Sequence, residues 1–290
     1  MKRLLFLLLL PYTLFSQERL SNLFNNPQLI TKEISGFSLE KGILLLPFID
    51  DFSYNSVFVD PDLWMESSVF VNRTYPINPP TLGVATFDGL DEKGFPRDLS
   101  QFNTSMPSDT LLSQPIDISM SSSVYVMFYF QSKGLGDAPD INDTLFLEFK
   151  NDTLGWEKVW FCNSDTSMFN FKKVVNIIDE SRFLHDQFQF RFINYATVSG
   201  NFDHWHIDYV KLDNFNSPSD TIILDDISFV YNSPSLLKRY NTMPWPHFLD
   251  NESLELKDSI DILLRNNQAS INVDYQYNEF ENNILLETFP

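Results

Sequence analysis

The chain has 290 residues, 43% of them hydrophobic and 28 of them Phe, and carries a formal net charge of −19. This composition is typical of a globular, β-rich protein and excludes a disordered chain. Asp and Glu outnumber Lys and Arg by 39 to 20, and the basic residues form no cluster, which excludes binding to nucleic acid and to anionic membrane surfaces.

Residues 1–16 are predicted to be a cleavable signal peptide. The stretch MKRLLFLLLLPYTLFSQ has a basic start, an apolar run from Leu4 to Leu10 and a polar exit at Ser16 and Gln17. The apolar run is too short to span a bilayer, so no membrane insertion is expected after cleavage. No cysteine follows the run, which excludes lipid attachment. The expected location is therefore secreted or on the outer cell surface.

Residues 17–40 are expected to form a leader without clear periodicity, and residues 41–232 a β-sandwich domain. Short apolar stretches in this region alternate with turn residues. In QFQFRF, Phe188, Phe190 and Phe192 alternate with polar residues, as on a half-buried strand. Strands are predicted at 43–48, 68–71, 82–87, 110–113, 123–131, 144–150, 156–162, 169–177, 187–193, 204–213 and 221–230.

The proline-rich stretch 233–252 is predicted to be a linker, and residues 253–290 are predicted to be the start of a second, truncated β-domain. That last region offers two strands with a turn at Asn266–Asn267, and two strands do not bury a core alone. If the chain is complete, these strands must instead pair with the first domain. The expected fold class is all-β: a jelly-roll-type β-sandwich followed by an incomplete second β-sandwich.

The stretch DHWHIDYVKLD places His204, His206 and Asp208 on one face of a predicted strand. Two histidines and an acid can bind zinc or begin a hydrolase site. The chain has only two further histidines and no recognisable metal spacing, and the same face is expected to continue into Val210 and Leu212 of the core. We therefore favour structural histidines over a metal or catalytic site, and no catalytic residue is assigned.

Calcium is the cofactor for which the sequence offers candidate ligands, at two places. The loop GLGDAPDINDT carries Asp137, Asp140 and Asp143, whose carboxylates could gather around Ca²⁺. Asp50 and Asp51 end an early strand, a position that in jelly rolls can face a late strand with an acid such as Asp208. Solvated turns are the favoured interpretation in both cases.

Neither a pair of catalytic carboxylates nor a reactive thiol can be picked out. The 39 acids offer too many pairs, and the single cysteine, Cys162, forms no internal disulfide and is read as a small buried residue. Trp64, Trp156, Trp160 and Trp205 could form a sugar-binding platform, although tryptophan in a sandwich is more often core.

One tripeptide recurs five times: Asp, then Thr or Ser, then an aliphatic residue. Its structural interpretation is that Asp ends a turn, the β-branched residue starts a strand and the aliphatic side chain enters the core. The hydroxyl residues of the five copies are Thr110, Thr144, Thr153, Thr221 and Ser259.

Several stretches in order resemble the N-terminal β-sandwich module of large, mostly uncharacterised surface proteins exported by type IX secretion. They are LPFIDDFS, DPDLWMESSVFVN, PPTLGVATFDGLDEKGFP, SDTLLSQPIDIS, FQFRFINYATVSGNFDHWHIDYVKLD and YNTMPWPHF. The element W-x-I-D-x-V is also similar to a late strand of MAM-like and cleaved-adhesin-like jelly rolls. That resemblance implies a calcium site at Asp208 with Asp50 or Asp51.

The resemblance also implies O-glycosylation at the five hydroxyl residues and export by the type IX machinery if a longer chain carries a sorting domain, which does not appear before Pro290. The leading hypothesis is a non-catalytic secreted or cell-surface module that serves adhesion, assembly or display, with an extracellular glycan or surface protein as its partner. The alternative is a carbohydrate-binding or accessory module of a secreted hydrolase. A weaker hypothesis is an enzyme that uses the histidine face.

Overall fold

The structure is a computed structural model that describes residues 25–29, 42–102, 104–164, 170–221, 226–250, 252–267, 274 and 276–289. The expected signal peptide and most of the expected leader lie outside these residues. The described part of the leader, 25–29, docks on the domain: the backbone amide of Asn26 donates to the Gly94 carbonyl at 2.8 Å, and the Leu29 side chain is buried.

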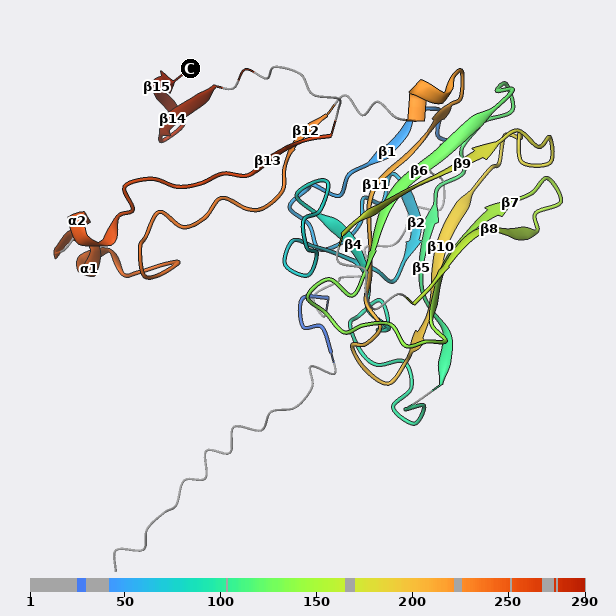
Figure 1. Cartoon of the computed structure of the whole chain (residues 1–290), viewed down its shortest axis with the longest axis horizontal. Coiled ribbons are helices and arrows are strands. Elements are labelled where there is room, and N and C mark those ends of the chain that lie inside the picture. Colours follow the sequence, from blue (N-terminus) through green and yellow to red (C-terminus); the bar gives the residue numbers. More distant parts are fainter. Residues whose placement is uncertain are drawn as a thin grey trace, which may run out of the picture.

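Two antiparallel sheets face each other and form a β-sandwich, which confirms the predicted all-β fold (Figure 1). The first sheet has the order β3-β4-β11-β6-β9, with β1 also pairing with β11; the second has the order β2-β5-β10-β7-β8. Their strands are β1 (Phe48–Asp50), β2 (Trp64–Ser67), β3 (Phe70–Asn72), β4 (Val84–Phe87), β5 (Ser105–Ser113), β6 (Val124–Ser132), β7 (Thr144–Lys150), β8 (Trp156–Asn163), β9 (Lys172–Ile178), β10 (Phe190–Thr197) and β11 (Trp205–Asn214).

The chain crosses repeatedly between the two sheets. From β5 in the second sheet it passes to β6 in the first, returns for the hairpin β7–β8, and then alternates through β9, β10 and β11. Such crossings are typical of Greek-key and jelly-roll sandwiches, in which sequence neighbours contribute to opposite layers. The arrangement brings residues far apart in the sequence onto the same edge, and this positions the sites described below.

Phenylalanine fills the space between the layers, as the alternation in QFQFRF predicts. Phe190 and Phe192 on β10 are fully buried, whereas Arg191 points outward and pairs with Glu148 on β7 at 2.7 Å. The rings of Phe128 on β6 and Phe192 meet edge to face, 4.8 Å apart, and so join the two sheets across the core.

A β-bulge in β11 changes the expected orientation of its side chains. Asp208 pairs with Tyr129 and Lys211 pairs with Met127, so two residues of β11, Tyr209 and Val210, lie opposite the single residue Phe128 of β6. Tyr209 has φ of 51°, which a bulge accommodates. The prediction that the histidine face continues into Val210 and Leu212 is therefore wrong: the bulge turns both of these side chains into the core.

Several predicted strand boundaries differ from the structure. The strand expected at 43–48 lies at 48–50, and β2 was not predicted, because its four residues show no alternation. The strand expected at 221–230 is represented by β12 (Ile227–Phe229), preceded by the 3₁₀ helix η1 (Pro218–Thr221); residues 222–225 lie outside the described part.

The C-terminal region contains short helices and two small hairpin-like pairs. The expected linker includes α1 (Trp245–Asp250), followed by α2 (Glu252–Glu255). The turn predicted at Asn266–Asn267 is wrong, because β13 (Leu264–Asn266) pairs with β12. The hairpin lies further on, between β14 (Tyr277–Glu281) and β15 (Ile284–Phe289), and these elements lie outside the two sheets in Figure 1. No helix in the described residues is long and apolar enough to cross a membrane.

Candidate metal centre

Part of the outer face of the first sheet, the face turned away from the second sheet, carries four buried polar side chains that are here called the polar layer: Thr86, His204, His206 and Asp208. His206 on β11 lies there, opposite Thr86 on β4. Its Nε2 is 3.2 Å from the Lys133 carbonyl, which can only accept, so Nε2 donates and Nδ1 accepts from the Thr86 hydroxyl at 2.8 Å. Burial, with a smaller contribution from His204, lowers the pKa of His206 to about 3. Both ring nitrogens are thus engaged in internal hydrogen bonds.

His204 is held in the same layer by a loop that follows β6. Its Nδ1 accepts from the backbone amide of Asp137 at 2.9 Å, and its ring stacks on Tyr75 with centroids 5.0 Å apart. Burial lowers the pKa of His204 to about 4. Because the Nδ1 lone pair accepts this bond, it is not free to bind a metal. The two imidazoles therefore join loops to the sheet and remain neutral at physiological pH.

Asp50, Asp51 and Asp208 lie in three different environments. Asp50 is buried on the core side and accepts from the Trp64 indole at 2.6 Å; burial raises its pKa to about 6. Asp51 accepts from the amide and hydroxyl of Ser53 at the surface. Asp208 is fully buried in the polar layer and accepts from the backbone amide of Thr81 at 2.9 Å. The three carboxylates thus do not converge on one point.

Thr81 links two of these acids and indicates the protonation state of one. Its hydroxyl lies 2.7 Å from the Asp51 carbonyl and 2.9 Å from Asp208 Oδ1. A hydroxyl carries one hydrogen, so both contacts are hydrogen bonds only when Asp208 is protonated and donates to Thr81. Burial raises the pKa of Asp208 well above its usual value, which agrees with this arrangement.

Asp140, Asp143 and Asp203 form a cluster in which one carboxylate oxygen from each lies within 4.8 Å of the other two. Of the loop acids predicted to bind calcium, the structure brings together Asp140 and Asp143 but not Asp137. Asp203 takes the third place, from the turn before β11. This cluster, here called the aspartate triad, is the group of three or more potential metal ligands found among the described residues.

Hydrogen bonds fix the triad in position. Asp143 accepts from the Ser105 hydroxyl at 2.5 Å and, through Oδ2, from the Asp140 amide at 2.7 Å. Asp203 accepts from the Thr197 amide at 2.7 Å and from the Asp140 amide at 3.3 Å. The cluster thus joins the 137–143 loop to the start of β5, the end of β10 and the start of β11.

The electrostatics of the triad favour a bound cation. Asp143 is fully buried and Asp203 is 2% exposed. Burial, followed by the charge of Asp143, raises the pKa of Asp203 to about 7, and burial also raises the pKa of Asp143. Neighbouring buried carboxylates do not ionise together without a counter-charge. Protonation at low pH would remove the negative charge of one carboxylate, and a divalent cation at neutral pH would supply the counter-charge.

The dimensions of the triad suit calcium. Calcium binds oxygen at about 2.3–2.6 Å, so oxygens on opposite sides of one ion lie up to about 5 Å apart. The triad spacing fits this limit. Calcium takes six to eight oxygens, and three carboxylates with added water molecules can provide them. The triad can therefore bind a metal such as calcium.

The sequence analysis assigned no role to Asp203 and overlooked a second buried acid pair, Asp88 and Asp109. Asp109 accepts from the backbone amides of Asp88 and Gly89, both at 2.8 Å, and forms an ion pair with Arg97 at 3.1 Å. Burial raises the pKa of both Asp88 and Asp109. The recurring Asp-Thr-aliphatic pattern was the available signal, since Asp109 and Asp143 belong to its first two copies.

The five proposed glycosylation positions differ in accessibility. Thr153 and Ser259 are exposed, whereas Thr110 and Thr144 are half-buried within or at the start of strands. The side chain of Thr221 lies outside the described part. Two of the tryptophans weighed as a sugar platform, Trp64 and Trp205, are fully buried in the core instead.

No family model matches the sequence, and no curated protein matches it. Among solved structures, the chain is similar to the K1 cleaved adhesin domain of Lys-gingipain from Porphyromonas gingivalis W83, with 9% identity, a TM-score of 0.38, and coverage of 59% of this chain and 99% of that one. It is also similar to TmCBM61 in complex with beta-1,4-galactotriose, with 13% identity, a TM-score of 0.33, and coverage of 67% and 99%. A third is the CBM22-1 xylan-binding domain from Paenibacillus barcinonensis Xyn10C, with 6% identity, a TM-score of 0.32, and coverage of 57% and 92%.

Proposed function

We propose that the protein is a non-catalytic β-sandwich module of an exported protein that serves adhesion, assembly or display at the cell surface. The observation that carries this proposal is that the side chains of the polar layer form hydrogen bonds within the fold. His204, His206 and Asp208, the residues best suited to chemistry, are buried and hydrogen-bonded to loops that they hold on the sheet. Side chains that are buried and hydrogen-bonded in this way stabilise the fold, and in this proposal exposed residues bind the partner.

In this proposal the aspartate triad binds calcium and fastens the loops at one end of the sandwich. Extracellular modules commonly use calcium sites of about 10⁻⁴–10⁻³ M affinity for this purpose. Asp140 and Asp143 come from one loop, and Asp203 from the turn before β11. A single ion would thus restrain two segments that are about 60 residues apart, without a disulfide.

The experiment that tests the function uses the exported chain on cells that carry it. Removal of residues 1–16 should leave the protein inside the cell, and antibody against the sandwich should label intact cells only when the gene encodes the signal peptide. Deletion of the gene should weaken attachment to surfaces or host material. An unchanged attachment phenotype, or hydrolytic activity that is lost in His206→Ala, would contradict the proposal.

Carbohydrate binding is a second candidate function because of one specific feature. A small pocket lined by amide and hydroxyl groups opens at the edge of the first sheet. An accessory module of a hydrolase would need such a site, and so would an adhesin for a glycan.

A further inference from the structure

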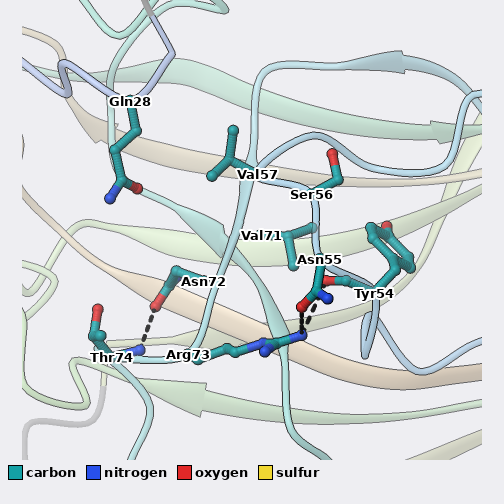
Figure 2. A pocket seen from close by; sticks show the side chains of 9 residues that line it. All are labelled: Gln28, Tyr54, Asn55, Ser56, Val57, Val71, Asn72, Arg73 and Thr74. Carbon is teal, nitrogen blue, oxygen red and sulfur yellow. Dashed lines mark hydrogen bonds between the residues drawn. The ribbon is translucent and has the colours of Figure 1, made fainter. Parts of the chain in front are cut away.

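A pocket of ≈ 260 Å³ lies beside β3, the edge strand of the first sheet (Figure 2). Residues of three segments form its walls: the described end of the leader, the loop after β1, and the end of β3 with the two residues that follow. The lining residues are Gln28, Tyr54, Asn55, Ser56, Val57, Val71, Asn72, Arg73 and Thr74. Asn72 donates to the Thr86 hydroxyl of the polar layer, and none of the lining residues belongs to the aspartate triad.

Internal hydrogen bonds preform the pocket. Val71 donates its amide to the Val57 carbonyl at 2.9 Å, which fixes the 54–57 loop alongside β3. The Arg73 guanidinium donates to the Tyr54 carbonyl at 3.3 Å and to Asn55 Oδ1 at 2.8 Å, and Figure 2 shows it along one wall. Since these walls are held before a ligand arrives, binding does not have to order them.

The lining combines an apolar side with hydrogen-bonding groups. The side chains of Val57, Val71 and Tyr54 provide the apolar surface, and the Tyr54 ring is fixed because its hydroxyl accepts from the Asp60 amide at 3.0 Å. Gln28 and Thr74 are exposed and contribute an amide and a hydroxyl; Figure 2 shows both on the side away from Ser56 and Tyr54. A sugar ring presents the same combination, with apolar C–H groups on its faces and hydroxyls around its edge.

Charge indicates that the ligand is neutral. Arg73 is the one cation of the lining, and its guanidinium donates to neutral oxygens within the fold, among them the Ser53 carbonyl and Asn55 Oδ1. Asp50 and Asp60 lie within electrostatic range of Tyr54, and the chain as a whole carries −19. An anionic ligand would meet repulsion from this field without a free cation to bind it.

We propose that this pocket binds a single neutral monosaccharide unit, such as the terminal residue of a glycan. The inference rests on the proposed recognition function and supplies its ligand class. The volume is slightly below the range of about 300–1,000 Å³ that is typical for drug-sized ligands, so the pocket holds one ring and not an extended chain. The exposed amide and hydroxyl then select the ring by its hydroxyl positions.

The test is a titration of the ¹⁵N-labelled protein with methyl glycosides, followed by NMR. The neutral panel contains glucose, galactose, mannose, xylose and N-acetylglucosamine glycosides, and glucuronate and galacturonate are the acidic counterparts. At least one neutral glycoside should shift the amide signals of residues 54–57 and 71–74. The double variant Gln28→Ala/Thr74→Ala loses two hydrogen bonds and should bind about tenfold more weakly.

The matched control is Gln101→Ala/Thr104→Ala, which removes the same side-chain types outside the pocket and should bind as the wild type does. The proposal is overturned if no neutral glycoside shifts the pocket signals, if the acidic sugars bind more tightly, or if the pocket variant binds like the wild type. Cell attachment distinguishes the pocket proposal from the proposed adhesion function. Attachment that persists in the pocket variant counts against the pocket as the binding site but leaves the adhesion function standing. Loss of attachment in that variant supports both the pocket and the adhesion function.

Discussion

Replacing Asp203 with Asn should change stability in opposite directions with and without calcium. In the metal-free protein the pKa of Asp203 is raised to about 7 from 3.8, so folding favours its protonated form. The stability that this group contributes is full below about pH 4 and is lost as the pH rises through 7. One pKa unit is worth about 1.4 kcal/mol, so the loss is at most about 4 kcal/mol. Asn carries no charge and escapes this penalty.

Calcium should reverse the order of the two proteins. At a concentration about 100 times its Kd, the ion adds about 2.7 kcal/mol to the stability of a protein that binds it only when folded. For a domain of this size, that corresponds to a rise in Tm of about 5–10 °C. Asp203→Asn lacks one of the three carboxylates and should gain little. At about pH 8 the variant is therefore expected to be more stable than the wild type in chelator, and less stable in calcium.

Thermal unfolding followed by circular dichroism measures this crossover. The control is Asp137→Asn, which removes an acid of the same loop that the structure leaves outside the triad. It should respond to calcium as the wild type does. The reasoning is refuted if calcium leaves the Tm of the wild type unchanged at about pH 8, or if the Asp137 and Asp203 variants respond alike.

Three further changes test other parts of the structure. Thr81→Val keeps the side-chain shape but removes the hydroxyl beside Asp208, and should lower the free energy of unfolding by about 1–3 kcal/mol in urea titrations; no loss would show that the hydroxyl contacts are dispensable. Arg97→Ala leaves Asp109 buried without its ion pair and should cost about 3 kcal/mol by the same assay, whereas a change below about 0.5 kcal/mol would contradict a buried pair. Intact-mass and peptide analysis of the exported protein should find glycan on the exposed Thr153 in preference to the half-buried Thr110, and occupancy of Thr110 alone would contradict this order.

Local patterns in the sequence were sufficient for the sandwich. The alternating side chains in 187–193 correspond to β10, and the stretch SVYVMFYFQ at 123–131, which is apolar at nearly every position, corresponds to β6. These are central strands of the two sheets. Both signals depend only on neighbours along the chain and on the two-residue period of a strand. The short edge strand β2 lacks that period, and it was therefore missed.

Pairing between strands that are far apart in the sequence determined the features that local sequence patterns did not predict. Trp205 pairs with Ser132, which brings the turn at Asp203 beside the loop that follows β6; no local pattern relates Asp203 to Asp140 across about 60 residues. The bulge at Tyr209 requires a positive φ in a residue that rarely adopts one, so alternation was extended through it. The chain also offers Asn-Asn at both 266–267 and 282–283, and only the second has the left-handed φ values, 49° and 64°, of a tight hairpin turn.

The central claim is that His204 and His206 serve the architecture of the sandwich and not a reaction. Long-range ¹H–¹⁵N NMR of the two imidazoles between about pH 8 and pH 5 tests it most directly. We expect both rings to stay neutral over this range, with the proton on Nε2 and with no change on addition of zinc. A protonation midpoint near the ordinary histidine value of about 6.5, or zinc-dependent shifts of both rings, would contradict the account.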